Sequence, residues 1–344
     1  MVTLRDVALA AGVSPAAASY ALSGSSKVTE ETAARVRKAA EELHYTGNLA
    51  AKALRQGKSG IIGVAVFELS REYPATLSYV ISTQALKHGM QALIQQISYS
   101  TKQERAFLRS MSNQYSDGMI LCSAGVPESE IAMLSKGRPA VILDDAAVTS
   151  YDTVLNPRED GMRTLIGHLF STGKSDPLII GAKPRTKKDA MAGASGNDRL
   201  LTGCYEGFAD NGHRLAKSRI VPLQAWDIEV ARLKAHELVE QHRIFDSAIC
   251  ATDTVALGFM RGLIECGVRV PEDVAVVGFD GINTARYGSP SLTTIEVDME
   301  EIASRAVELL MNRINAPAED ADHTPQHVTV GYRLRVGEST VGRQ

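Results

Sequence analysis

The chain has 344 residues, of which 44% are hydrophobic and 22% charged, a composition typical of soluble globular proteins. No uninterrupted apolar run reaches the ~18–20 residues that a membrane span needs, so the sequence excludes a membrane helix and favours two or three soluble domains. The net charge is −3, but residues 1–58 carry eight Lys and Arg against five Asp and Glu, so a basic head precedes an acidic body.

The beginning of the chain and its cysteines argue for an intracellular protein. The first residues include Arg5 and Asp6 and no long apolar run, so we expect no signal peptide. The four cysteines lie far apart and form no CxxC pair, which argues against a disulfide framework or a zinc site. We therefore expect a cytoplasmic protein with no metal and no cofactor.

Residues 1–46 show three short helical patterns. The first begins at Thr3, an N-cap with Asp6 three residues on, and ends at Gly12. The second begins at Ser14 and Pro15, and the third is capped by Thr29. Two short helices joined by a tight turn through Gly12 predict a helix-turn-helix, although a generic three-helix bundle is the alternative.

In a helix-turn-helix the second helix enters the major groove of DNA with its N-terminal residues against base edges. The side chains expected to face bases are Pro15, Ala16 and Tyr20, with Ala16 suited to a thymine methyl. Ser14 and Ser19, together with the helix N-terminus, are expected to hold phosphates.

The head resembles the DNA-binding head of the lactose-repressor/galactose-repressor (LacI/GalR) family. The shared residues are Thr3, Asp6-Val7-Ala8, Ala11-Gly12-Val13-Ser14, Ser19, Leu22-Ser23, Val28, Thr32, Arg35-Val36 and Leu43. The resemblance implies a transcriptional regulator, with Thr3 among its DNA contacts. Ala17-Ala18 replace the Thr-Val pair that usually precedes Ser19 in the family, which removes a hydroxyl near the DNA.

Residues 47–59 predict a hinge. Asn48 can cap a helix too short to be stable alone, so it would order only on DNA or against a second copy. The resemblance implies a hinge helix that pairs across a dimer and inserts Leu54 into the minor groove, with Lys52 and Arg55 at phosphates. Gly47 and Gly57 leave a plain linker as the alternative.

Residues 60–344 alternate short apolar runs with helical patterns, which predicts βαβ units and parallel sheets. A second series begins near residue 158 and repeats the architecture. The predicted fold class is therefore α/β: an all-α helix-turn-helix head followed by two doubly wound lobes. Ligands of such sheets bind at the carboxyl ends of the strands, here in a cleft between the lobes.

The resemblance extends over the body, which is similar to the periplasmic-binding-protein-type core of the family. It implies an N-terminal lobe of residues 60–157 and 287–319 and a C-terminal lobe of residues 158–286 and 320–344. Carboxylates, arginine and aromatic rings suit the hydroxyls and C–H faces of a sugar. The expected effector contacts are Tyr73, Arg199, Trp226, Thr252, Asp253 and Asp280.

These patterns predict a regulator, most plainly a repressor, that binds a palindromic operator as a homodimer and responds allosterically to a small molecule in the cleft. A sugar is the expected effector. The sequence carries no GxSxG, GxxxxGK[ST], HExxH or strand-following GxGxxG motif, so we expect no enzyme. The alternatives are a solute-binding protein and a sugar-processing enzyme with the same core.

Overall fold

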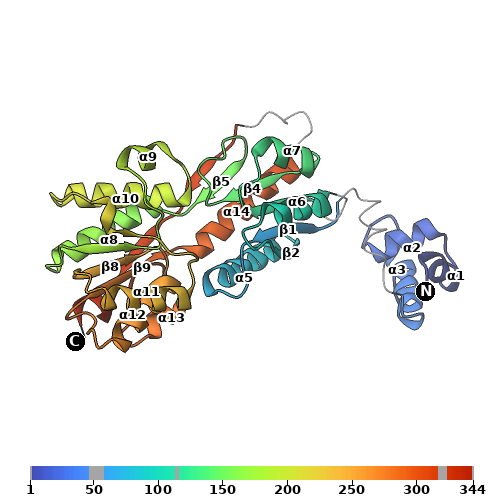
Figure 1. Cartoon of the computed structure of the whole chain (residues 1–344). Coiled ribbons are helices and arrows are strands. Elements are labelled where there is room, and N and C mark those ends of the chain that lie inside the picture. The colour runs from blue at the N-terminus through green and yellow to red at the C-terminus, as the bar shows by residue number, and fades with distance from the viewer. Residues whose placement is uncertain (1, 46–57, 113–115, 317–323, 343–344) are drawn as a thin grey trace. The chain divides into compact units, whose positions relative to one another are not determined.

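The computed structural model describes residues 2–45, 58–112, 116–316 and 324–342. The chain divides into two compact units, Met1–Gly60 and Ile61–Gln344, each with its own contacts. Among the described residues, no helix is both long and apolar enough to cross a membrane. The predicted fold class is confirmed, because a helical head precedes two α/β lobes (Figure 1).

The head consists of three helices whose starts are set by local capping. Helix α1 spans Leu4–Ala10, α2 spans Pro15–Leu22 and α3 spans Glu30–Glu42. Thr3, Ser14 and Thr29 each accept a hydrogen bond from the backbone amide three residues on, and Thr3 and Asp6 form a full capping box. A small apolar core joins the helices: Val7, Ala8, Ala18, Ala21, Ala33, Val36 and Ala39.

The first lobe is built on a parallel sheet with strand order β11-β5-β4-β3-β1-β2. Its strands are β1 Ile61–Val66, β2 Gln91–Gln96, β3 Gly118–Cys122, β4 Ala140–Leu143, β5 Asp152–Leu155 and β11 His327–Thr329. Its helices are α5 Glu72–Lys87, α6 Thr101–Ser110, α7 Glu128–Ser135 and α14 Met299–Asn315. Helices α5 and α14 pack on one face and α6 and α7 on the other.

The second lobe repeats this design with strand order β12-β10-β9-β8-β6-β7, parallel except for β12. Its strands are β6 Pro177–Ile180, β7 Ile220–Val221, β8 Ser247–Cys250, β9 Ala275–Asp280, β10 Thr293–Val297 and β12 Tyr332–Arg335. Its helices are α8 Arg158–Ser171, α9 Lys187–Ala192, α10 Gly196–Asp210, α11 Ile228–Glu240, α12 Asp253–Glu265, α13 Asn283–Tyr287 and α15 Glu338–Val341, with a short 3-10 helix at Lys217–Arg219.

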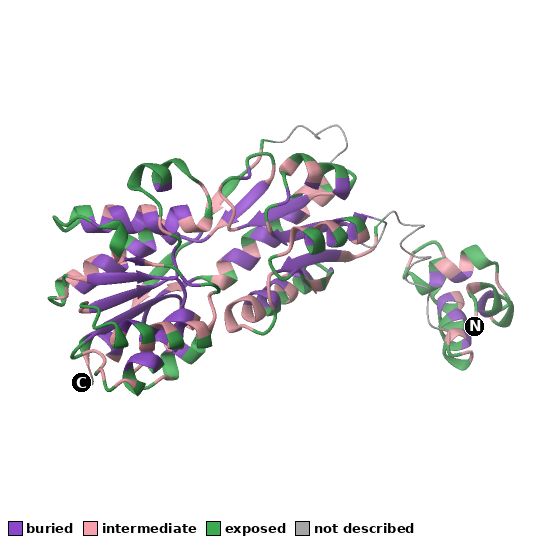
Figure 2. Cartoon of the chain, in the orientation of Figure 1, coloured by how far each residue is buried: buried purple, intermediate pink, exposed green. Residues whose placement is uncertain are grey.

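Both sheets bury their strands between helices, as continuous apolar runs require. Figure 2 shows buried central strands in each lobe and helices whose outer faces are exposed. Five strands of each sheet follow the order 2-1-3-4-5, in which the direction of winding reverses beside the first strand. Ligands of such sheets bind at that reversal, beyond the carboxyl ends of the strands.

The expected lobe boundaries near residues 286 and 320 are wrong. Strand β10 pairs with β9 in the second sheet, so residues 293–297 lie in the second lobe and not in the first. Strand β11, expected in the second lobe, pairs with β5 in the first sheet. The chain therefore changes lobe after β5, after β10 and after β11. The lobe boundaries depend on which distant strands pair with each other, and the local pattern of apolar residues does not reveal that pairing.

Candidate functional site

The exposed face of α2 is the candidate DNA-reading surface. Ser14, Pro15, Ala16 and Tyr20 are exposed, whereas the opposite face of the helix turns Ala18 into the core of the head. Ser14 Oγ accepts the amide of Ala17 at 3.2 Å and so fixes the start of the helix. The predicted contact residues on α2 therefore share one side of the helix.

Lys27 brings a positive charge to this surface through its contact with Tyr20. The ring is 39% exposed, and the ammonium of Lys27 lies 4.9 Å from its centroid. This contact places a positive charge beside a hydroxyl that can reach a phosphate or a base edge. Ser19 is half-buried on the same helix. Thr3 is exposed, but its hydroxyl donates to Asp6 Oδ2 at 2.7 Å, so the structure gives it a capping role.

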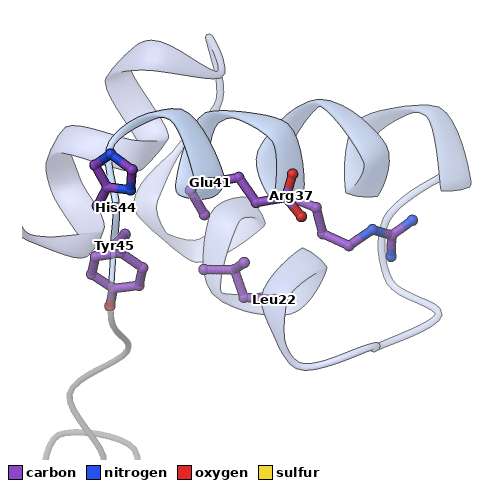
Figure 3. A pocket seen from close by; sticks show the side chains of 6 residues that line it. Leu22, Arg37, Glu41, His44 and Tyr45 are labelled. Carbon is purple, nitrogen blue, oxygen red and sulfur yellow. The ribbon is translucent and has the colours of Figure 1, made fainter.

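The predicted hinge contacts Asn48, Lys52, Leu54 and Arg55 lie outside the described residues. A shallow surface pocket lies at the ends of α2 and α3 (Figure 3), lined by Leu22, Arg37, Ala40, Glu41, His44 and Tyr45. The pocket is open and contains none of the predicted DNA or effector contacts. We therefore do not assign the effector to it.

In the second unit, two buried carboxylates stand at neighbouring strand ends. Asp280 ends β9 and is 5% exposed, and Asp253, fully buried, begins α12 directly after β8. Asp253 Oδ2 accepts the amides of Gly281 and Ile282 at 2.8 and 2.9 Å. Its Oδ1 accepts the hydroxyl of Thr294 at 2.5 Å. Asp253 therefore holds the turn after Asp280.

The turn after β9 has an unusual backbone. Asp280 has a φ of 125° and Gly281 a φ of 77°, and a non-glycine residue in that region is strained and typical of functional sites. A Cβ on Gly278 would lie 2.2 Å from Asp253 Oδ1. Only glycine at position 278 therefore lets the Asp253 carboxylate reach the turn and present Asp280.

Burial raises the pKa of Asp280 well above its usual range, and the neighbouring carboxylates of Asp253 and Asp144 add to the rise while Arg158 opposes it. Burial likewise raises the pKa of Asp253. Because its pKa is raised, Asp280 contributes most to the stability of the folded protein below its unfolded-state pKa. That contribution declines as the pH rises through the folded-state pKa.

We therefore expect Asp280→Asn to be more stable than the wild type at pH 7, by a margin that shrinks as the pH falls to 5. The neutral amide avoids the burial of a charge, at ~1.4 kcal/mol per unit of pKa shift. Thermal midpoints of both proteins from pH 5 to 8 measure the margin. A margin independent of pH would show that the folded-state pKa of Asp280 is not raised into or above this window.

Arg199 and Asp144 connect the two lobes across the strand ends. Arg199 lies on α10 of the second lobe and donates through Nη1 to Asp144 Oδ1 at 3.2 Å, beyond the end of β4. Its Nη2 donates to the carbonyl oxygen of Asn156 at 2.6 Å, and Nε lies 3.4 Å from Glu159 Oε1. Arg199 is thus a buried cross-lobe contact as well as a predicted effector contact.

Tyr73 joins this group from the start of α5 in the first lobe. Its hydroxyl donates to Asn156 Oδ1 at 3.1 Å. Burial raises the pKa of Tyr73 far above its usual range, with Asp280 and Asp144 adding to the effect. The phenol therefore stays neutral and is available as a donor or acceptor beside Asp280.

Trp226 and Thr252 have mainly local partners. Trp226 Nε1 donates to the carbonyl of Gly181 at 2.8 Å, and the half-buried ring stands beside the guanidinium of Arg158 at 5.8 Å. Thr252 is the N-cap of α12, where its hydroxyl accepts the amide of Val255 at 3.3 Å. Trp226 therefore remains beside the predicted site, whereas Thr252 positions Asp253.

Sequence reasoning missed Arg158 and Asn156, which are buried, and Asp144. Arg158 begins α8, where a charged first-turn residue is ordinarily solvated, so no local pattern singled it out. Asp144 directly follows the apolar run of β4, and that position was the one signal that could have found it. Within the described ranges, no group of three or more His, Cys, Asp and Glu side chains could hold a metal ion.

Two family models match the chain. Residues 3–48 match bacterial regulatory proteins of the lacI family, and residues 166–340 match a periplasmic binding protein-like domain. The HTH-type transcriptional repressor PurR of Pectobacterium carotovorum is 28% identical over 348 residues, which cover 98% of each chain.

Solved structures agree with this match. A putative LacI-family transcriptional regulator from Sanguibacter keddieii is 30% identical, with a TM-score of 0.72 over 82% of this chain and all of that one. The lac repressor dimer bound to operator and the anti-inducer ONPF has a TM-score of 0.84 at 23% identity, over 98% of this chain and 99% of that one. At 23% identity, the similarity to the lac repressor shows a shared fold alone.

Proposed function

The chain belongs to the LacI family of bacterial regulators, and on this premise we propose a repressor that binds a palindromic operator as a homodimer and is switched by a sugar-class effector. Relatives of the chain are transcriptional repressors, and the helix-turn-helix supports the same activity for this chain. We place the protein in the cytoplasm, where the operator is accessible.

The observation that carries the proposal is the exposed face of α2. Pro15 and Ala16 are small enough to let the helix approach the bases closely, and Tyr20 stands one turn further along. Two heads related by a dimer axis would read two half-sites, which is why a palindrome is proposed. The lac repressor structure, a dimer on its operator, supports this arrangement.

We place the switch at the contacts between the two lobes. Arg199 links α10 to Asp144, and Glu72 at the start of α5 accepts the amides of Asn283 and Thr284 at the start of α13. Both contacts join different lobes, so a change in the angle between lobes must break or form them. An effector that binds one angle better shifts the population of that angle, and with it the affinity for DNA.

Sugar-class effectors suit the side chains at the strand ends. Asp280 offers carboxyl oxygens to hydroxyls, Tyr73 offers a phenol, and Trp226 offers a ring face. Alternating hydroxyl groups and C–H faces are the features that such a set recognises.

The test uses the full chain. Duplexes selected from a random library should yield a palindromic sequence that the protein prefers over random competitor, with an affinity that falls steeply with salt. Fluorescence anisotropy on that duplex, with and without a panel of sugars, then measures the switch. The absence of any DNA sequence preference at low salt would refute the proposal. An affinity for the selected duplex that no sugar changes would refute the proposed sugar effector.

We expect Tyr20→Ala to weaken binding to the selected duplex roughly 10-fold, because it removes both the hydroxyl and the ring that holds Lys27. Tyr20→Phe is the matched control, since it keeps the ring and removes only the hydroxyl. Anisotropy titrations of the three proteins measure the effect. Equal affinities for all three would remove Tyr20 from the reading surface.

A further inference from the structure

Arg158 carries donors that the fold leaves unused. The residue begins α8 and is 5% exposed. Its Nη2 donates to Asp144 Oδ2 at 3.3 Å, but the buried Nε and Nη1 have no hydrogen-bond partner in the protein. Burial lowers the pKa of Arg158, yet the carboxylates of Asp144 and Asp280 outweigh it and raise the pKa, so the side chain is charged. A buried guanidinium with unpaired donors is unfavourable unless a ligand completes it.

The surroundings of Arg158 add positive potential. A Cβ built on Gly196, the first residue of α10, would lie 4.0 Å from Arg158 Nε, so the guanidinium faces the amino end of a 15-residue helix. That end carries a partial positive charge, and Ser195 Oγ accepts the amide of Asp198 there. Two positive features thus face each other, which favours an anion between them.

The acidic side chains around Arg158 accept no hydrogen bond from its Nε or Nη1. Asp144 shares its oxygens between Arg158, Arg199 and the amide of Asn156. Asp198, in the first turn of α10, accepts the hydroxyl of Ser195 at 2.5 Å and pairs with Arg185 at 3.3 Å. Asp280 raises the pKa of Arg158 but forms no hydrogen bond with it, so Asp144, Asp198 and Asp280 all leave Nε and Nη1 of Arg158 without an acceptor.

Aromatic rings complete the site. The guanidinium lies 4.9 Å from the ring centroid of Phe279 and 5.8 Å from that of Trp226. These rings hold its plane in place and exclude water, which strengthens a charged hydrogen bond made there.

We propose that the effector carries an anionic oxygen group, a carboxylate or a phosphate, which Arg158 Nε and Nη1 bind at the amino end of α10. This inference rests on the proposed function and narrows its effector to an acidic sugar. The hydroxyls of the same molecule would meet Asp280 and Tyr73. The anionic group would supply the acceptors that the protein itself does not provide to Arg158.

Isothermal titration calorimetry of the full chain tests the class with matched ligands. The probes are D-glucuronate against D-glucose, D-galacturonate against D-galactose, and D-glucose 6-phosphate. At least one anionic probe is expected to bind about 10-fold or more tightly than its neutral parent. A preference for the uronates identifies a carboxylate, and a preference for the phosphate ester identifies a phosphate.

Variants separate recognition from folding. Arg158→Met should weaken binding of the preferred acid about 10- to 100-fold and abolish its advantage over the neutral sugar, while Arg158→Lys should retain part of it. Arg163→Met is the matched control, because Arg163 lies on the same helix, is exposed and pairs with Asp210. A merely structural role of Arg158 would weaken acid and neutral sugar alike.

Three results would overturn the inference: no anionic probe binds, a neutral sugar binds as tightly as its acid, or Arg158→Met keeps the preference. A neutral sugar that changes operator affinity, with no anionic probe binding more tightly than its neutral parent, would refute the inference and leave the proposed function standing. Loss of the proposed function is read separately, from the absence of sequence-selective DNA binding whatever the sugars do.

Discussion

Val36→Asp is expected to abolish operator binding and to leave effector binding unchanged. Val36 is 0% exposed in the core of the head, on the inner face of α3. A buried unpaired carboxylate costs several kcal/mol, on the order of 4 or more, and a head this small has little stability in reserve. The head should therefore unfold, and its reading helix with it.

The second unit should survive this change because Met1–Gly60 and Ile61–Gln344 are separate compact units. Anisotropy on the selected duplex and calorimetry with an effector measure the two activities side by side. Ala34→Asp is the matched control, since Ala34 is exposed on the same helix. A variant that still binds its operator would mean that the apolar core of the head is not what holds α2.

Asp253→Ala is expected to lower the free energy of unfolding of the second unit by about 3 kcal/mol and to eliminate effector binding. The carboxylate accepts two backbone amides and the hydroxyl of Thr294, all inside the protein. Alanine would leave these donors buried without an acceptor. The strained turn at Asp280 would then lose the contacts that hold it.

Urea unfolding followed by circular dichroism measures the loss, and calorimetry measures effector binding. Asp273→Ala is the control, because Asp273 is an exposed partner of Arg269 and its removal should change stability little. Effector binding that survives in Asp253→Ala would indicate that Asp280 does not depend on the turn for its position.

The head could be predicted in detail because its signals are local. The caps at Thr3, Ser14 and Thr29 and the proline at the start of α2 act within one turn of helix, and all three caps are confirmed. Strand–helix alternation likewise predicted two α/β lobes. The lobe boundaries failed because β10 and β11 choose partners far away in sequence.

Pattern alone predicted the site only at residues that end a strand or lie just after one, whereas Tyr73, Arg199 and Trp226 came from the family resemblance. That position identified Asp253 and Asp280. It did not show that both oxygens of Asp253 accept hydrogen bonds within the protein whereas those of Asp280 do not. Arg158 and Asn156 escaped notice because their roles depend on α8, α10 and β4 meeting in space. Contacts among distant segments of the chain have no signature in any short stretch of sequence.

The late pairing of β11 has a consequence for synthesis on the ribosome. The head and strands β1 to β5 emerge first, but the first sheet lacks an edge strand until residues 327–329 follow. At 5–20 residues per second, roughly 10–35 seconds separate β5 from β11. A nascent polypeptide would therefore have a complete head well before the first lobe could complete its sheet. The unpaired edge of β5 would be open to chaperones throughout that interval.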